Sequence, residues 1–424
     1  MNQITDRLLN ETYMEEVLPN GLDVIVWHKP LFTSSHVMFA TPYGSLDREQ
    51  TDPAGVHYQF PAGIAHFLEH KLFESDERDV MEEFSRLGAN VNAYTSFEKT
   101  ACYFETAAGD ISAPLNLLLD FVQDFSVSEA SVEKEKPIII QELNGYRQDP
   151  VSRLDLETFN SMYQNHPIRY DICGDEASIK AITKAQLEQC YQLNYHPGRM
   201  MLVAVTPSDP AMIIDLVRKN QAAKTFALAV KLERYTASEP LQVIRTQSEV
   251  NLNLSEPRVC IGIKLPVIQE SDKQREQRDW AVKTSMDAWF SSVNPDYQKW
   301  LDQGLISSYF SYESDFSKDM AMILFYDRTK DAEGFRSFIE NQLPKWQSAK
   351  IKESTVAQLR NRGIGTMLHL FNHPSDIART FFDCRMKGIS LSEEYQIISS
   401  LSCETLKNAV SQLDLSQRTI TIEK

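Results

Sequence analysis

The segment from Gly63 to His70 holds the residues with the clearest capacity for chemistry. It reads Gly-Ile-Ala-His-Phe-Leu-Glu-His and so contains H-x-x-E-H. On a helix, His66 and His70 lie one turn apart on one face, and Glu69 lies beside them. Two imidazoles at that spacing can bind one side of a Zn²⁺ ion, and the carboxylate can reach water at an open position on the metal. Zinc lowers the pKa of that water, Glu69 takes its proton, and the resulting hydroxide attacks a polarised carbonyl. The pattern therefore predicts a zinc hydrolase with Glu69 as its general base.

A second histidine pair shows how much the acid matters. His369 and His373 have the same spacing, but Asn372 stands where the carboxylate would be. Asparagine cannot act as a general base, so we assign this pair a structural or surface role. His166 and His196 are each followed by proline, which is typical of loops and turns rather than of metal ligands.

The third zinc ligand must come from elsewhere, because a catalytic zinc usually has three protein ligands plus water. Glu135 and Glu142 are seven residues, or two helical turns, apart and so share a face with Ile138 and Ile139 nearby. A carboxylate buried on such a face needs a partner, and a metal ion would be one. The alternative is an ordinary solvated helix, since 133–136 reads Glu-Lys-Glu-Lys. The spacing leaves both interpretations open. The acidic candidates are Glu74, Glu77, Glu82, Glu83, Glu98, Glu133, Glu135 and Glu142.

The elements that must position these residues follow from hydrophobic periodicity and turn signals. In the first half we expect strands over 22–27, 36–40, 91–95, 102–106 and 200–205, and helices over 62–74, 80–87, 114–125, 131–146, 153–163 and 183–193. In the second half we expect strands over 259–265, 305–312, 320–326 and 419–422, and helices over 275–290, 296–303 and between 331 and 413. The order of strand, helices, strand pair, helices and strand occurs twice, which predicts two α+β domains. We place a zinc-binding domain over 1–221, a connector over 222–257 and a second repeat over 258–424.

Composition narrows the class of protein. The chain has 424 residues, 42% of them apolar and 24% charged, so it can form real cores. Its formal net charge of -16 argues against nucleic acid and acidic membrane surfaces as partners. The N-terminus lacks the apolar segment of a signal peptide, and no stretch is apolar for long enough to span a membrane. The six scattered cysteines, Cys102 among them, are expected to be reduced and mostly buried, which favours a cytoplasmic protein.

Several further phrases accompany the histidine motif, which extends as Lys-Leu-Phe-Glu to Glu74. They are Leu18–Leu22, Tyr43–Ser45, Asn92–Ser96, Glu135–Glu142 and Asn194–Pro197. Together they resemble the insulinase/pitrilysin family of zinc metallopeptidases, which has the inverzincin motif and includes the mitochondrial processing peptidases. The resemblance covers most of the chain, and Gly63–Glu74 is its most specific phrase. It is strongest to short bacterial members that work as one half of a two-chain assembly.

The resemblance implies a fold and a set of roles. The fold would be two homologous α+β domains of mixed or antiparallel sheet packed with helices, forming half of a metallopeptidase clamshell. His66 and His70 would bind one Zn²⁺ per chain, with Glu69 as general base. By its place in the family's E-x6-E pattern, Glu142 would be the third ligand, and Glu135 would be the acid that orients the site.

The resemblance also implies how substrate binds. Asn92, Ala93 and Tyr94 match the family's edge strand, which pairs with an extended peptide by β-augmentation. The second half would be a catalytically inert repeat that closes over the substrate. In the family that half often supplies an arginine and a tyrosine, for which Tyr326 and Arg328 are candidates that cannot be placed on the pattern.

Two departures from the family pattern matter. Pro137 lies between Glu135 and Glu142, so either the helix begins near it or the helix is kinked. The second half has no H-x-x-E-H, so the residues that complete the site could belong to a partner chain. We therefore expect a homodimer or a heterodimer with a related chain.

The sequence as a whole predicts a zinc metalloendopeptidase that cleaves peptides or unfolded segments in an enclosed cleft. The main alternative is a non-catalytic or regulatory subunit of a heterodimeric peptidase, which binds peptides without cleaving them. A zinc hydrolase of a non-peptide amide is a third possibility, which the edge-strand match disfavours. The acidity of the chain adds the hypothesis that basic peptides are preferred.

Overall fold

The computed structural model describes residues 1–75, 78–107 and 109–424. The chain forms two compact units, each assembled from separate segments. The first unit contains residues 1–143, 170–235 and 370–386, and the second contains residues 144–169, 236–369 and 387–424.

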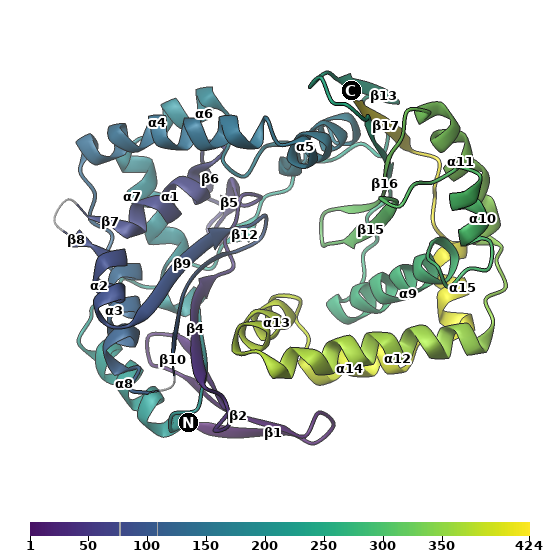
Figure 1. Ribbon diagram of the computed structural model, residues 1–424. Helices are drawn as coiled ribbons and strands as arrows, with labels where there is room; N and C mark the ends of the chain where they lie inside the picture. The colour runs from purple at the N-terminus through teal and green to yellow at the C-terminus, as the bar shows by residue number, and fades with distance from the viewer. Residues whose placement is uncertain (76–77, 108) are drawn as a thin grey trace. The chain divides into compact units, whose positions relative to one another are not determined.

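The first unit is built on a seven-stranded sheet (Figure 1). Its strands, from one edge to the other, are β1 (Asn2–Asp6), β2 (Glu11–Val17), β3 (Asp23–His28), β11 (Met201–Thr206), β4 (Ser34–Thr41), β10 (Thr100–Ala107) and β9 (Ala89–Thr95). Neighbouring strands are antiparallel except β11 and β3, which are parallel. β9 is therefore an edge strand, paired on one side by β10.

Helices cover this sheet on both faces. The helices of the first unit are α1 (Ile64–Phe73), α2 (Val80–Arg86), α3 (Ser112–Val122), α6 (Glu176–Ala181), α7 (Lys184–Asn194), α8 (Pro210–Ala222) and α13 (Pro374–Met386), and α4 (Glu129–Tyr146) has all but its last three residues here. Short elements complete the unit: β5 (Glu49–Thr51), β6 (His57–Gln59), β7 (Glu74–Ser75), β8 (Arg78–Asp79), β12 (Glu233–Arg234), η2 (Pro197–Arg199) and η3 (Leu370–Asn372).

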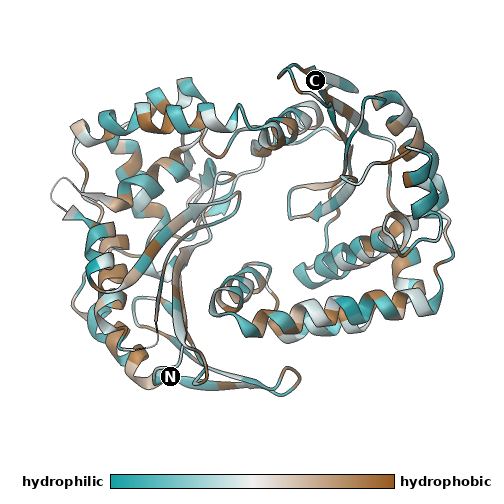
Figure 2. Cartoon of the chain, in the orientation of Figure 1, coloured by the Kyte–Doolittle hydropathy of each residue, from teal (hydrophilic) through white to brown (hydrophobic). Residues whose placement is uncertain are grey.

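Because side chains alternate along each strand, the sheet packs against helices on both of its faces. Val37, Phe39 and Phe104 point to one face, where they join a buried core with residues of α1, α3, α4, α7 and α8. The intervening residues point to the other face, where α13 packs against β4 and β11. Helices with one face in a core carry both hydrophobic and hydrophilic bands, as Figure 2 shows for α3 and α8.

The second unit has a smaller, five-stranded sheet. Its strand order is β13 (Gln247–Val250), β17 (Arg418–Glu423), β14 (Arg258–Lys264), β16 (Ala321–Arg328) and β15 (Ser311–Phe316). Its helices are α5 (Pro150–Met162), η1 (Pro167–Arg169), α9 (Asp272–Phe290), α10 (Tyr297–Asp302), α11 (Ala332–Gln347), α12 (Glu353–His369), α14 (Leu391–Ser399) and α15 (Cys403–Ser411). A separate hydrophobic core forms between this sheet and α9, α10, α11 and α15.

Each unit takes a covering helix from the other half of the sequence. α5 follows α4 in the chain but packs against β14 and β17 of the second unit, and α13 follows α12 but packs against the sheet of the first unit. The compact units are consequently discontinuous, whereas the boundaries 1–221, 222–257 and 258–424 describe continuous segments. Those boundaries stay a prediction about the two repeats.

The predicted α+β fold is confirmed, and most elements lie where periodicity places them. The expected strand over 305–312 is wrong, because β15 begins only at Ser311. The residues from Gly304 to Phe310 form turns and loop, so Tyr309 and Phe310 precede the strand and only Ser311 and Tyr312 of the expected range lie in it. The connector over 222–257 contains two short strands, β12 and β13, that the sequence does not predict. β1, β2, α6 and α8 were not predicted either.

Two further expectations about the chain as a whole can be compared with the structure. All six cysteines are free, and five of them are buried, as expected. Within the described residues, none of the helices has the length and apolar character needed to cross a membrane. The cytoplasmic location stays a prediction.

Candidate metal centre

The first turn of α1 fixes where the histidine motif begins. Gly63 has a φ of 86°, in the left-handed region that favours glycine. A Cβ at this position would lie 2.2 Å from the carbonyl oxygen of Cys173, so the backbone of a distant loop leaves no room for a side chain. Behind this turn, Phe67 and Leu68 are fully buried, and burying each such side chain stabilises the fold by about 2 kcal/mol. Gly63 therefore lets the chain turn into the helix, and Phe67 and Leu68 anchor the buried face of the helix.

Three side chains, two from α1 and one from α4, converge on one another. His66 and His70 lie on α1 with ring centroids 4.5 Å apart. Glu142 reaches them from α4, with one carboxylate oxygen 3.7 Å from His66 Nε2 and the other 3.4 Å from His70 Nε2. One ligand atom from each residue lies within 4.8 Å of the others, and no other group of three such side chains occurs in the described parts of the chain. The structure thus brings Glu142 to the histidine pair.

The other acidic candidates for a third ligand lie elsewhere. Glu82 and Glu133 are exposed and pair with Arg86 and Lys136, and Glu83 is half-buried on α2. Glu98 is in the turn between β9 and β10. Glu77 and the side chain of Glu74 lie outside the described residues.

Glu135 lies behind the histidines rather than beside them. It is 3% exposed, and its two oxygens lie 3.0 Å from His70 Nδ1 and 3.0 Å from Lys71 Nζ. Burial raises the pKa of this carboxyl, but the hydrogen bonds from His70 and Lys71 outweigh burial and lower it to about 2. A carboxylate that accepts a hydrogen bond from Nδ1 fixes the ring so that Nε2 faces forward. Lys71 is a member of this cluster that sequence reasoning missed.

The pKa values of the two histidines shift in opposite directions. Burial and the neighbouring charge of His70 lower the pKa of His66 to about 3, so this imidazole is neutral, which is the form that binds metal. Burial also opposes charge on His70, but its hydrogen bond to Glu135 and the surrounding carboxylates raise its pKa. In the described residues His66 Nδ1 is buried without a hydrogen-bond partner.

Glu69 is tied to the edge strand of the sheet. Thr95 Oγ1 on β9 donates a hydrogen bond of 2.6 Å to Glu69 Oε2. Burial raises the pKa of Glu69, and the bond from Thr95 opposes this shift. The sequence shows Thr95 within a family phrase, but its role in holding Glu69 emerges only from the fold.

Pro137 does not mark the start of its helix. α4 begins at Glu129 and contains Pro137 in its interior, so the option of a helix beginning near the proline is wrong. Glu135 and Glu142 nevertheless lie on the same side of α4, since both reach α1. The helix tolerates a residue without a backbone N–H here because its other turns are packed through Val132, Ile139 and Leu143.

The predicted substrate strand is the open edge of the first sheet. Asn92, Ala93 and Tyr94 all lie on β9. The Asn92 side chain accepts the backbone N–H of Ala93 at 2.8 Å, so this backbone donor is satisfied within the chain. An edge strand of this kind presents backbone groups to which a further strand can pair.

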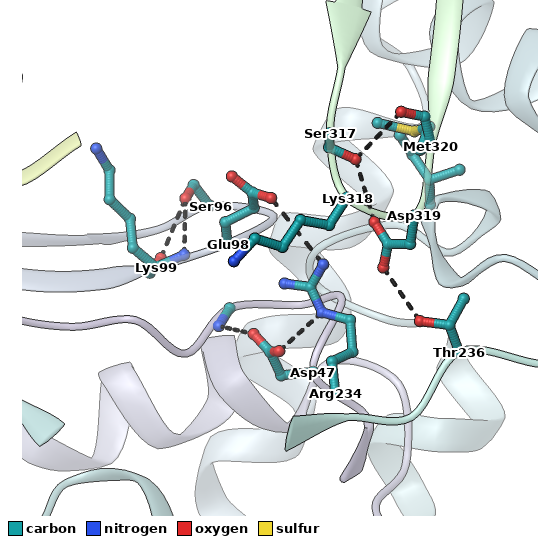
Figure 3. A network of polar contacts seen from close by, with 12 residues as sticks. Asp47, Ser96, Glu98, Lys99, Arg234, Thr236, Ser317, Lys318, Asp319 and Met320 are labelled. Carbon is teal, nitrogen blue, oxygen red and sulfur yellow. Dashed lines mark hydrogen bonds and ion pairs between the residues drawn. The ribbon is translucent and has the colours of Figure 1, made fainter. Parts of the chain in front are cut away.

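The turn that follows β9 is held by a polar network (Figure 3). Asp47 accepts a hydrogen bond from the Gly44 N–H and another from Arg234 Nε, each of 2.8 Å. The same guanidinium lies 4.0 Å from Glu98 in the turn. A Cβ on Gly44 would lie 2.5 Å from the backbone of Phe97, so the two loops touch at a glycine. The phrase Tyr43–Ser45 therefore supports the position of the edge strand.

The remaining predicted residues are not part of this centre. His369 ends α12, and His373 follows the separate turn η3, so the second histidine pair does not share one helix. His166 Nδ1 accepts a backbone N–H two residues on, as does His196 Nδ1, in agreement with a turn role for both. Tyr326 donates to Glu313 within the second unit.

Arg328 also belongs to the second unit, where its guanidinium lies 3.8 Å from the ring centroid of Tyr309. Cys102 is buried, and burial raises its thiol pKa. It is a packing residue, as the absence of a suitably placed histidine in the sequence indicates.

Comparison with known proteins agrees with this geometry. Residues 54–176 match the family described as insulinase (peptidase family M16), and residues 181–382 match the peptidase M16 inactive domain. An uncharacterized zinc protease of Bacillus subtilis, YmfH, is 34% identical over 406 residues, which are 95% of this chain and 94% of that protein. A probable mitochondrial-processing peptidase subunit beta of Schizosaccharomyces pombe is 29% identical over 48% of this chain and 43% of its own.

Solved structures share the fold. A putative M16-like peptidase from Alicyclobacillus acidocaldarius has a TM-score of 0.91 at 31% identity and covers 97% of both chains. The periplasmic protease PqqL from Escherichia coli has a TM-score of 0.74 at 17% identity, so it shows likeness of fold alone. The match to PqqL covers 99% of this chain but only 48% of that protein.

Proposed function

We propose that this chain, which belongs to the insulinase family of peptidases (peptidase family M16), is a zinc-dependent endopeptidase that cleaves peptides or unfolded protein segments. The observation that carries the proposal is the convergence of His66, His70 and Glu142, with Glu69 beside them and Glu135 behind them.

The donor set suits zinc. Two imidazole nitrogens and one carboxylate oxygen are the ligands of many catalytic zinc sites, and they leave a position free for substrate. A buried carboxylate on Nδ1 of a ligating histidine is the usual support for such a site, and Glu135 provides it. When bound, the zinc ion polarises a peptide carbonyl and makes water a stronger acid.

Glu69 is the residue that moves the proton in this proposal. Its carboxylate takes a proton from the attacking water and gives it to the leaving amine when the peptide C–N bond breaks. Burial raises the pKa of Glu69, which makes the carboxylate a better proton acceptor. The hydrogen bond from Thr95 fixes one oxygen of Glu69 and leaves the other for this transfer.

The substrate of the proposed enzyme pairs with β9. An extended peptide on this edge would pair with the segment of Asn92, Ala93 and Tyr94 and would replace the Asn92 side chain as acceptor of the Ala93 N–H. Thr95 connects the same strand to Glu69, so a peptide bound here would lie next to the proposed base. Backbone pairing depends little on the side chains of the peptide, so the specificity would be loose. The peptide must be extended to pair, so the substrate must be an unfolded segment.

A second candidate function concerns pairing. The likeness to PqqL covers about half of that protein, which favours a working unit of two such halves. The chain could then serve as a regulatory or peptide-binding subunit beside a related chain, or as the active half of a homodimer or heterodimer.

The test combines metal analysis with peptide cleavage. The purified chain should contain one zinc per chain and cleave members of a quenched peptide library, whereas Glu69→Gln should retain zinc and lose cleavage. Glu142→Gln should lower zinc content, and Glu133→Gln on the same helix is the matched control. Cleavage that survives in Glu69→Gln would refute the mechanism. Zinc-replete protein without cleavage, alone or with a co-purified related chain, would favour the regulatory role.

A further inference from the structure

Arg379 lies on the face of the first sheet opposite to the metal centre. It is an exposed residue of α13, the helix that packs against β4 and β11 (Figure 1). Its guanidinium lies 5.7 Å from the ring centroid of Tyr94 and 5.5 Å from that of Tyr103. Cation–π contacts at these distances hold a guanidinium without neutralising its charge. Arg379 is thus stacked beside the edge strand.

The charge of Arg379 has no ion-pair partner among the residues that the structure describes. Two acids of this face are paired with other cations, Glu15 with Arg385 and Asp383 with Lys99. Asp376 precedes Arg379 by three residues on α13, and no ion pair joins the two in the described residues. Glu105 lies 3.0 Å from His36 Nδ1. Arg379 is therefore a guanidinium of this face that no ion pair holds in the described residues, so it can bind a carboxylate of a ligand.

Strand register places this guanidinium within reach of alternate residues of a bound peptide. Ala93 lies opposite Cys102, which points into the helical core, and Thr95 points to Glu69. Tyr94 points to the other face, where its ring lies 6.3 Å from that of Tyr103. A strand added to β9 continues this alternation, so every second side chain would lie on the face that carries Arg379, and the one nearest Tyr94 would be next to it.

We propose that Arg379 selects acidic side chains at alternate positions of the peptide that pairs with β9. The inference rests on the proposed function, because it needs a peptide on that edge. The planar guanidinium, stacked on two tyrosines, would bind a glutamate or aspartate carboxylate. The local preference is opposite in sign to the preference for basic peptides that the net charge of -16 suggests.

The two ideas differ in their dependence on position and salt. Attraction by the overall charge would favour lysine at every position and would fade as salt is raised. Contact with Arg379 would favour glutamate at every second position, because adjacent residues point to opposite faces.

The test uses neutral ten-residue peptides in which one glutamate or one lysine is moved along the chain. Binding is measured with zinc-loaded Glu69→Gln protein, and cleavage with the protein that retains Glu69. At alternate positions the glutamate peptide should bind about two- to fivefold more tightly than its lysine counterpart, the range of a partly exposed ion pair. In cleavage assays the same ratio should appear in KM rather than in kcat, because this contact is remote from the reacting bond.

Variants at Arg379 decide the inference. Arg379→Gln should abolish the preference, and Arg379→Glu should reverse it, with unchanged affinity for the neutral peptide. Arg7→Glu is the matched control, since Arg7 is an exposed arginine at the far edge of the same sheet. Thermal unfolding of each variant checks that it folds.

The outcomes separate the inference from the proposed function. An unchanged preference in Arg379→Glu, or an equal response at adjacent positions, would overturn the role of Arg379 even if peptides are cleaved. Failure to cleave any peptide, with the alternating pattern of binding intact, would instead remove the hydrolytic function and leave the binding role of Arg379.

Discussion

Substitution of Glu135 by glutamine tests how much the metal centre depends on a residue that does not face the metal. The change removes a negative charge from a side chain that is 3% exposed and contacts both His70 and Lys71 at 3.0 Å. The amide keeps the shape of the carboxylate, so packing is preserved and the effect reports charge and hydrogen bonding.

Two consequences of Glu135→Gln can be given magnitudes. Loss of one partner of a buried ion pair costs about 3 kcal/mol, so the metal-free protein should lose stability of that order, since Lys71 is 2% exposed. Loss of the support behind a ligating histidine typically lowers metal affinity by about 10- to 100-fold. Zinc affinity should fall by a factor in that range, although Glu135 does not belong to the convergent donor group.

The assay pairs urea unfolding of the metal-free protein with zinc titration against a chelator. Glu133→Gln is the control, because Glu133 precedes Glu135 by two residues, is 68% exposed at its side chain and pairs only at the surface with Lys136. The control should change stability by less than about 0.5 kcal/mol. If Glu135→Gln matched the control in both stability and zinc affinity, the hydrogen bond to His70 would have no orienting role.

Three further predictions concern other parts of the chain. Gly63→Ala should destabilise the protein by about 2 kcal/mol or more in urea unfolding, because its Cβ would overlap Cys173. Gly55→Ala, at a similar φ of 83° but in open space, should cost only about 1 kcal/mol, and equal losses would contradict the steric argument. Burial raises the pKa of Glu423 to about 7, so the unfolded chain ionises first and stability should fall by about 2 kcal/mol as the pH rises from 4.5 to 7. Glu423→Gln should flatten that profile, and an unchanged slope would assign it to other groups. Metal analysis should give one zinc per chain, since the described residues form one suitable cluster, and two equivalents would reveal another site.

The sequence predicts which residues could bind a metal better than it predicts the contacts that position them. Spacing alone puts His66, Glu69 and His70 on one helix, because the helical repeat is a local property. The choice of Glu142 over other acids depends on how α4 packs against α1, which is a long-range contact that spacing leaves open. Family resemblance supplied that residue, and the structure places it 3.4 Å from His70 Nε2.

Lys71 and Arg379 make contacts that cannot be predicted from the local sequence. Lys71 follows the motif and reads as a surface lysine, but the packing of α4 buries it beside Glu135. Arg379 is more than 280 residues from Tyr94 in the sequence, and only the exchange of α13 into the first unit brings the two together. No local pattern can predict a helix that packs on the sheet of the other half.

The two units show why a shared arrangement of elements does not imply shared chemistry. In the first unit α1 packs against the edge strand β9, and in the second α9 packs against the edge strand β15. Two buried acids of α9 are paired with lysines: Asp279 with Lys283 at 2.6 Å, and Glu276 with Lys387 at 3.0 Å. Lysine ammonium groups, which neutralise these acids, compete with a cation for the same carboxylates. Around α1, Glu142 instead meets the imidazoles of His66 and His70, whose nitrogens donate to a metal when neutral. Glu135 behind them meets both His70 and Lys71. The two units therefore differ in which bases face their carboxylates, although they share an arrangement of helix and edge strand.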